Sequence, residues 1–281
     1  MITPARPLRS RALVGLGLAC ALLVSVIGPA TVSGSGSSTS STNPPSSPTS
    51  ATVESYLLRW LNHDRALRGL RPMRAWAALR SVATGRASTL ANLGALSHTA
   101  AGSLSTQLGN AGVRYYAWGE DLGYSSYTWG YSVAKSLYTM WRHSSAHWRL
   151  MMSSRYNYLG VGLAYRWSAH TTYASIVFTE SPDHTYPWIR MTGASRSGTT
   201  AKFTWRAYDP LLQTHTAGFR SSDLEYRIDN GSWHLLRTGR TNFTISLYDR
   251  PRGHYYYIRA RGRDRAGNLS PWSRAVHVYI P

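Results

Sequence analysis

The segment 118–122 reads Trp-Gly-Glu-Asp-Leu and carries Glu120 between a glycine and an aspartate. Two further short segments flank it along the chain: Leu-Ser-His-Thr at 96–99 and Trp-Arg-His-Ser-Ser-Ala-His at 141–147. Neutral imidazoles and carboxylates are the ligands that zinc and similar divalent ions accept. The three segments therefore each contain a candidate metal-ligating side chain: His98, Glu120 and His147.

Outward from these segments, apolar residues recur first at helical spacing and later at strand spacing. Helices are predicted at 53–68, at 76–93, from Ser103 onward and at 128–143, with Gly69 and Gly94 as stop signals. Strands are predicted within 156–178, and a central strand is predicted near 114–117. Helices that precede strands in this way predict an α+β layer arrangement.

The order and spacing of the three segments resemble the CAP superfamily, the secreted α-β-α sandwich domains related to plant pathogenesis-related protein 1, antigen 5 and cysteine-rich secretory proteins. Residues of the first predicted helix and turn fit the family's opening motif: Asn62, Arg65, Gly69 and Met73. Gly-Val-Gly at 160–162 stands where the family has a strand. The resemblance covers residues 53–183 and implies an α-β-α sandwich with His98, Glu120 and His147 at its site.

Two positions depart from the family pattern. Asp121 replaces the asparagine of the glutamate motif, and Ser144 stands where eukaryotic members carry a second glutamate. With a single site carboxylate, no second group is available as general acid while Glu120 acts as base. The resemblance therefore implies a site but does not carry over a four-residue hydrolytic or metal centre.

Three interpretations of the site remain open. It can bind a small ligand or a divalent ion such as zinc, it can be a metal-assisted hydrolase with Glu120 as catalytic base, or it can be a structural hydrogen-bond cluster. Ser144 and His143 are auxiliary candidates, the first as a nucleophile beside His147 and the second as a further ligand if one helix carries both histidines. Asp121 is expected on the opposite face of the strand from Glu120.

Aromatic residues crowd the glutamate segment, and they can line a cleft for a glycan or a lipid or simply pack in the core. The residues are Tyr115, Tyr116, Trp118, Tyr124, Tyr127 and Trp129.

The N-terminus predicts export. Arginines precede an apolar run at 12–27 that ends in small residues, so residues 1–30 are expected to be a cleaved signal peptide, with an uncleaved anchor as the alternative. Cys20, the only cysteine, lies in this run and fits a lipoprotein signal poorly. Residues 31–52 are rich in Ser, Thr and Pro and are expected to form a linker. A cleaved chain would have no disulfide and no membrane span.

A second unit is predicted at 186–281. Seven short stretches of β-forming residues are separated by turn signals such as Asp-Asn-Gly at 229–231, which indicates a β-sandwich. Its aromatic pattern and its ending, with Arg-Asp-Arg-Ala-Gly-Asn at 263–268, resemble fibronectin type III and related bacterial Ig-like domains. Such sandwiches serve both as spacers and as binding modules.

The chain has 31 basic and 12 acidic residues, a formal charge of +19, and lysine only at positions 135 and 202. Guanidinium groups bind phosphate and carboxylate, so anionic cell-envelope polymers are candidate partners, without specific nucleic-acid binding. An alternating set, here called the arginine row, is expected on one exposed strand face: Arg259, Arg261, Arg263 and Arg265. The sequence thus predicts a secreted ligand or metal binder, with a hydrolase and an adhesin as alternatives.

Overall fold

The computed structural model describes residues 50–127 and 130–281. The expected signal peptide and almost all of the expected linker lie outside the described residues, as do Thr128 and Trp129. No helix among the described residues is long and apolar enough to cross a membrane.

The first part of the fold contains a four-stranded sheet in the order β1, β3, β4, β2. Its strands are β1 (Arg74–Ala75), β2 (Ala117–Ser125), β3 (Tyr158–Arg166) and β4 (Thr171–Glu180). β1 runs parallel to β3, and the other neighbours are antiparallel. The predicted central strand near 114–117 is wrong, because the glutamate segment itself forms the strand. β2 pairs with β4 along its whole length and occupies an edge of the sheet.

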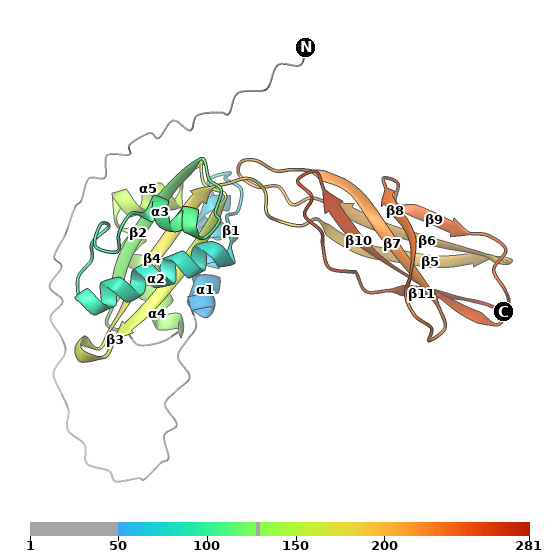
Figure 1. Cartoon of the computed structure of the whole chain (residues 1–281), viewed down its shortest axis with the longest axis horizontal. Helices are drawn as coiled ribbons and strands as arrows, with labels where there is room; N and C mark the ends of the chain where they lie inside the picture. The colour runs from blue at the N-terminus through green and yellow to red at the C-terminus, as the bar shows by residue number, and fades with distance from the viewer. Residues whose placement is uncertain (1–49, 128–129) are drawn as a thin grey trace, which may run out of the picture. The chain divides into compact units, whose positions relative to one another are not determined.

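Helices cover both faces of this sheet (Figure 1). They are α1 (Ser50–Ala66), α2 (Ala77–Leu93), α3 (Leu104–Asn110), α4 (Gly130–Arg142) and α5 (Ser145–Met151). One apolar cluster joins α1 and α4 to one face of the sheet, and another joins α2 and α3 to the opposite face. Gly94 ends α2 in the left-handed region at φ 73°, and the Ser103 hydroxyl accepts a hydrogen bond from the Thr106 amide at the start of α3.

The Gly-Val-Gly segment allows α2 to lie directly on β3. A Cβ atom at Gly160 would fall on the backbone of Leu79 and Arg80, and one at Gly162 would fall on Ala83. These two glycines therefore set the close packing of helix and sheet that carries one wall of the site.

Asn62 and Arg65 of the opening motif act as structural ties. The Asn62 side chain exchanges two hydrogen bonds with the backbone of Met73, at 2.9 and 3.0 Å. Arg65 is fully buried and donates to the carbonyl oxygens of Met151 and Ser153. Burial lowers the pKa of Arg65 to about 10, so its guanidinium remains charged at neutral pH. Asn62 thus ties α1 to the segment before β1, and Arg65 ties α1 to the end of α5 and the residues just after it.

The second part of the fold is a sandwich of two antiparallel sheets, ordered β11, β10, β7, β8 and β5, β6, β9. Its strands are β5 (Trp188–Ser197), β6 (Thr200–Tyr208), β7 (Phe219–Ile228), β8 (His234–Arg240), β9 (Thr244–Leu247), β10 (His254–Asp264) and β11 (Val276–Ile280). Trp205, Phe203 and Ile258 fill its core, and the Trp205 indole donates to the Ser222 hydroxyl at 2.9 Å. The predicted fold class, α+β followed by a β-sandwich, is confirmed.

Candidate functional site

Glu120 lies on β2 with its carboxylate buried and every acceptor position in use. One oxygen, Oε1, accepts from Arg86 Nε and from the Ser175 hydroxyl, the latter at 2.8 Å. The other, Oε2, accepts from Arg86 Nη2 at 2.8 Å and contacts His98 Nδ1 at 2.9 Å. A carboxylate has about four lone-pair positions. Glu120 therefore has none left for a metal ion or a substrate proton in this arrangement.

Arg86 is the partner that the sequence analysis missed. It comes from α2, is 1% exposed, and donates to the His98 carbonyl at 2.7 Å and to Gly102 and Gln107 at 3.1 Å each. Arg86 thus joins α2, the loop that carries His98, α3 and β2. The sequence does contain an indication that Arg86 is buried, because it lies seven residues after Leu79 and three after Ala83, on the buried face of its helix.

The charge state of Glu120 follows from these contacts. Burial acts to raise its pKa, but the hydrogen bonds from His98 and Arg86, the charge of Arg86 and the hydrogen bond from Ser175 together lower it. Glu120 is therefore ionised at neutral pH and holds its proton weakly, which makes it a poor general base.

His98 is oriented by Glu120. With Glu120 ionised, Nδ1–H donates to the carboxylate, and the side chain is 52% exposed. The Nε2 lone pair of this tautomer remains available to an ion or a ligand. A carboxylate behind the imidazole is the usual support of a metal-binding histidine.

His147 lies on α5 with a buried Nδ1 that has no hydrogen-bond partner among the described residues. Burial lowers the pKa of His147, and electrostatic interaction with His98 lowers it further. His147 is therefore neutral at neutral pH. Neutral imidazole is the form that binds metal ions.

Of the three predicted ligands, His98 and Glu120 are in direct contact. Among the described residues, a group of three or more His, Cys, Asp or Glu side chains whose ligand atoms all lie within 4.8 Å of one another is formed by Asp183, Asp209 and Asp264, and the three predicted ligands do not form such a group. Glu120 instead stands behind His98 as its hydrogen-bond acceptor.

The auxiliary candidates lie apart from this arrangement. α4 ends at Arg142 and α5 begins at Ser145, so His143 and His147 are not on one unbroken helix. The exposed His143 donates from Nδ1 to the Thr139 carbonyl at 2.7 Å. Ser144 has the extended backbone of an N-cap residue, but its side chain makes no capping hydrogen bond.

Asp121 points away from Glu120 and is 1% exposed. Its Oδ2 has no hydrogen-bond partner among the described residues. Burial raises the pKa of Asp121 well above its ordinary value, and the neighbouring charge of Glu120 adds to the effect. The residue is a buried, proton-retaining carboxyl at the position where the resembling family has asparagine.

Several of the aromatic residues near Glu120 are on the surface. Trp118 and Tyr124 share the strand face of Glu120 and are 43% and 47% exposed. Tyr116 and Tyr127 are exposed as well. These rings are available to a ligand and are not required to fill the core.

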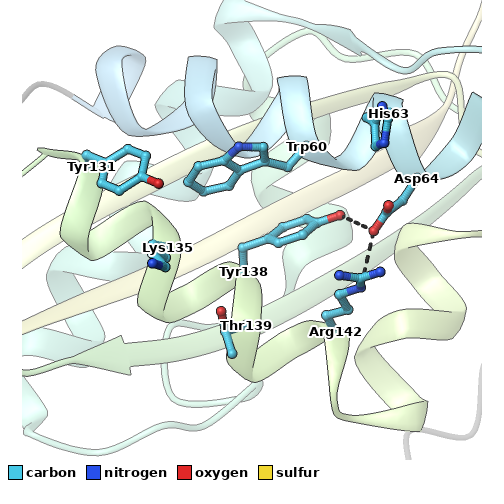
Figure 2. Close-up of a pocket in the computed structure, with 8 residues that line it drawn as sticks. All are labelled: Trp60, His63, Asp64, Tyr131, Lys135, Tyr138, Thr139 and Arg142. Atoms are coloured by element: carbon cyan, nitrogen blue, oxygen red, sulfur yellow. Dashed lines mark hydrogen bonds and ion pairs between the residues drawn. The ribbon is translucent and has the colours of Figure 1, made fainter.

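A separate cavity of about 300 Å³ lies between α1 and α4 (Figure 2). Its lining includes Trp60, Tyr131 and Lys135. Asp64 joins one side to the other through a hydrogen bond from Tyr138 at 2.7 Å and an ion pair with Arg142 at 3.3 Å. None of the predicted site residues lines it, so it is distinct from the histidine site.

The arginine row differs from the prediction in its surroundings. β10 alternates as expected, with Tyr256, Ile258 and Ala260 buried on the opposite face. Arg265, however, lies beyond the end of β10, so three of the four arginines share the strand face.

The counter-charge for the row comes from β7, which pairs with β10 across the sheet. Arg259 pairs with Glu225 at 2.7 Å, and Asp223 pairs with Arg261 at 3.1 Å and with Arg263 at 3.9 Å. The Arg259 guanidinium also lies 4.2 Å from the Trp233 ring centre and 5.2 Å from that of Trp272. These cation–π contacts and ion pairs give the row a structural role on the outer face of the sandwich.

Comparison with protein-family models gives no match, and no curated protein matches the chain. Among solved structures, an extracellular SCP-domain protein from Bacillus anthracis is 18% identical with a TM-score of 0.40, over 45% of this chain and 40% of that one. An outer surface protein from Borrelia burgdorferi is 14% identical with a TM-score of 0.41, over 46% and 92%. A fibronectin type III-like protein from Clostridium thermocellum is 20% identical with a TM-score of 0.26, over 34% and 96%. By its own topology, and in line with the resemblance in sequence, the chain has a CAP-like α+β part followed by a fibronectin type III-like sandwich.

Proposed function

We propose that the CAP-like part is an extracellular binding module whose His98 and His147 take a zinc-like divalent ion, or the ligand that such an ion presents. The observation that carries this proposal is the saturation of Glu120 by Arg86, Ser175 and His98. A saturated carboxylate behind a histidine orients that histidine for binding and does not accept protons from a substrate.

The donor set fits a borderline-soft ion. His98 presents Nε2 because Nδ1 is held by Glu120, and His147 brings a neutral imidazole with an unpartnered buried nitrogen. Two imidazoles leave coordination positions for water or for a ligand oxygen, to which a bound ion would supply Lewis acidity. The exposed Trp118 and Tyr124 supply apolar surface for the rest of a glycan or lipid ligand.

Export belongs to the same proposal, since the apolar run at 12–27 has the form of a secretion signal. N-terminal sequencing of the protein recovered from the culture medium would test it. A new N-terminus near residue 31 is expected, whereas a full-length chain in the membrane fraction would support an anchor.

The hydrolase alternative requires Glu120 to act as base, and its lowered pKa and full set of hydrogen bonds oppose that role. The adhesin alternative depended on uncompensated arginines, and Glu225 and Asp223 compensate three of them. Neither alternative has an observation in its favour that the binding proposal lacks.

Calorimetric zinc titration of the purified protein tests the proposal. His98→Ala and His147→Ala should each weaken binding at least tenfold, and Glu120→Gln should weaken it by about ten- to a hundredfold through loss of orientation. His143→Ala is the matched control, because it removes an exposed imidazole outside the site and should leave the affinity unchanged. Equal zinc binding in all four variants would contradict the proposal. Turnover of a peptide substrate that is lost in Glu120→Gln would favour the hydrolase.

A further inference from the structure

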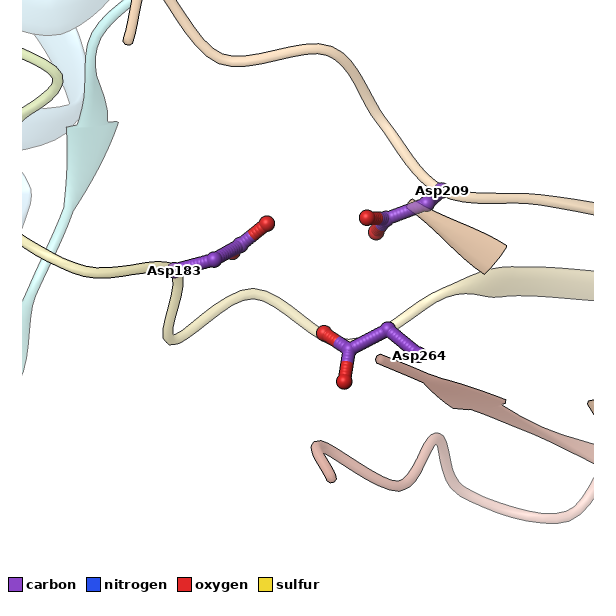
Figure 3. Close-up of side chains that lie close together, drawn as sticks. All are labelled: Asp183, Asp209 and Asp264. Carbon is purple, nitrogen blue, oxygen red and sulfur yellow. The ribbon is translucent and has the colours of Figure 1, made fainter. Parts of the chain in front are cut away.

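Three aspartates that are distant in sequence meet at one end of the sandwich: Asp183 from the segment between β4 and β5, Asp209 directly after β6, and Asp264 at the end of β10. We call them the three-aspartate cluster. Figure 3 shows their carboxylates turned toward one another, and oxygen atoms from all three lie within 4.8 Å of one another. The residues are 5%, 7% and 0% exposed, respectively.

The cluster has no protein cation beside it. The chain has 31 basic residues for 12 acidic ones, yet no ion pair within 4.0 Å joins any of these three carboxylates to a basic group in the described part of the chain. Arg265 lines the adjacent hollow without forming such a pair. Like charges buried together without compensation are strongly unfavourable. In so basic a protein, these acids are placed where a cation from solution could compensate their charge.

Hydrogen bonds position the carboxylates but leave one oxygen unused. Asp183 accepts from the Ala217 amide at 2.8 Å, Asp264 accepts from Asn268 at 2.7 Å, and Asp209 Oδ2 accepts from the Gly218 amide at 2.6 Å. Asp209 Oδ1 is buried and has no hydrogen-bond partner among the described residues. Figure 3 shows the Asp209 carboxylate directed at the other two. An orphaned oxygen aimed into a ring of carboxylates is an open coordination position.

The pKa of Asp209 reflects the unfavourable burial of this carboxylate beside two others. Burial raises the pKa of Asp209 to about 6, despite the hydrogen bond from the Gly218 amide, and the charges of Asp183 and Asp264 contribute to the rise.

We infer that the three-aspartate cluster binds a hard divalent cation, with calcium as the expected ion. All its donors are carboxylate oxygens, which suit calcium or magnesium and not the softer ions expected at histidines. A hollow of about 350 Å³ that is lined by Asp183, Thr216 and Ala217 opens beside the cluster, and it gives an ion and its remaining water ligands a way in. The ion would fasten the segment before β5 to the ends of β6 and β10.

The test is thermal unfolding of the purified protein in EDTA and in calcium chloride up to about 10 mM, since extracellular calcium modules bind at about 0.1 to 1 mM. Magnesium chloride and sodium chloride at matched ionic strength are the comparison salts. The wild type should gain several degrees in Tm with calcium, because an ion that binds only the folded state stabilises it by mass action.

Asp209→Asn separates ion binding from a simple folding defect. The asparagine can still accept from the Gly218 amide but has no charge, so this variant should melt higher than the wild type in EDTA and gain little from calcium. Asp249→Asn makes the same chemical change at an exposed site and should respond to calcium as the wild type does.

The outcomes divide cleanly. Stabilisation by magnesium as well as calcium supports a hard-cation site. A wild-type Tm that moves no more in calcium than in sodium chloride, or an equal calcium response in Asp209→Asn, would overturn the inference.

Discussion

Glu120 and the three-aspartate cluster both place carboxylates out of water, and the protein compensates them in opposite ways. Glu120 receives hydrogen bonds from a buried arginine, a serine and a histidine. The aspartates receive amide hydrogen bonds, but no basic side chain in the described part of the chain forms an ion pair with them. A buried carboxylate that the protein's own cations compensate, such as Glu120, can orient a neighbouring side chain. A group of buried carboxylates without such compensation is suited to bind a cation from solution.

Loss of the Arg86 charge should leave Glu120 uncompensated, and it should have the largest effect on the stability of the protein. Arg86→Met leaves Glu120 charged and buried without its partner, which costs about 3 to 5 kcal/mol for such pairs. Urea unfolding measures the loss.

The double variant Arg86→Met with Glu120→Gln removes the stranded charge and should recover a large part of that stability. If the double variant is as unstable as the single one, the charge of Glu120 is not what Arg86 compensates.

Asp121 is a third buried carboxyl, and among the described residues it has neither a counter-ion nor a full set of hydrogen bonds. Asp121→Asn should stabilise the protein at neutral pH by about 1 to 3 kcal/mol, since it removes the cost of a poorly satisfied buried acid.

The stabilisation by Asp121→Asn should increase with pH. The pKa of Asp121 is raised in the folded state above its ordinary value of 3.8, so the folded protein holds the proton more tightly than the unfolded chain. Stability is then lost as pH rises from about 3.8 to the raised pKa. The advantage of Asp121→Asn should grow across that window in urea unfolding at several pH values. An advantage that shrinks as pH rises would contradict the assignment.

The smallest effect is expected on the arginine row, whose ion pairs are partly exposed. Glu225→Gln releases Arg259, whose side chain is 26% exposed, so it should change stability by less than about 1 kcal/mol. Retention on immobilised sulfated dextran should increase and remain sensitive to salt. Asp249→Asn adds the same net charge elsewhere, and an equal increase in that control would show that overall charge alone is responsible.

Local patterns predicted much of the fold. Helical periodicity and glycine stops located α2 and its end at Gly94, and Ser103 was identified as a cap. Turn signals separated all seven strands of the sandwich. These features depend on neighbours along the chain, which a sequence displays directly.

Contacts across the fold could not be predicted in the same way. The glutamate segment proved to be a full edge strand because its partner is β4, more than fifty residues later. Arg86 reaches Glu120 over 34 positions, and Asp223 and Glu225 meet the arginine row only through the pairing of β7 with β10. The short helix α5, which carries His147, was also missed. The three-aspartate cluster joins residues 183, 209 and 264, which no local motif connects.

We expect two sites in this chain to select ions of different kinds, because one offers neutral imidazoles and the other offers buried carboxylates without a counter-charge among the described residues. Anomalous diffraction from crystals soaked in both zinc and calcium tests this expectation, because maps on either side of the zinc edge distinguish the two ions. Zinc is expected at His98 and His147, and calcium is expected among Asp183, Asp209 and Asp264. Zinc bound directly to Glu120, or no ion among the three aspartates, would contradict it.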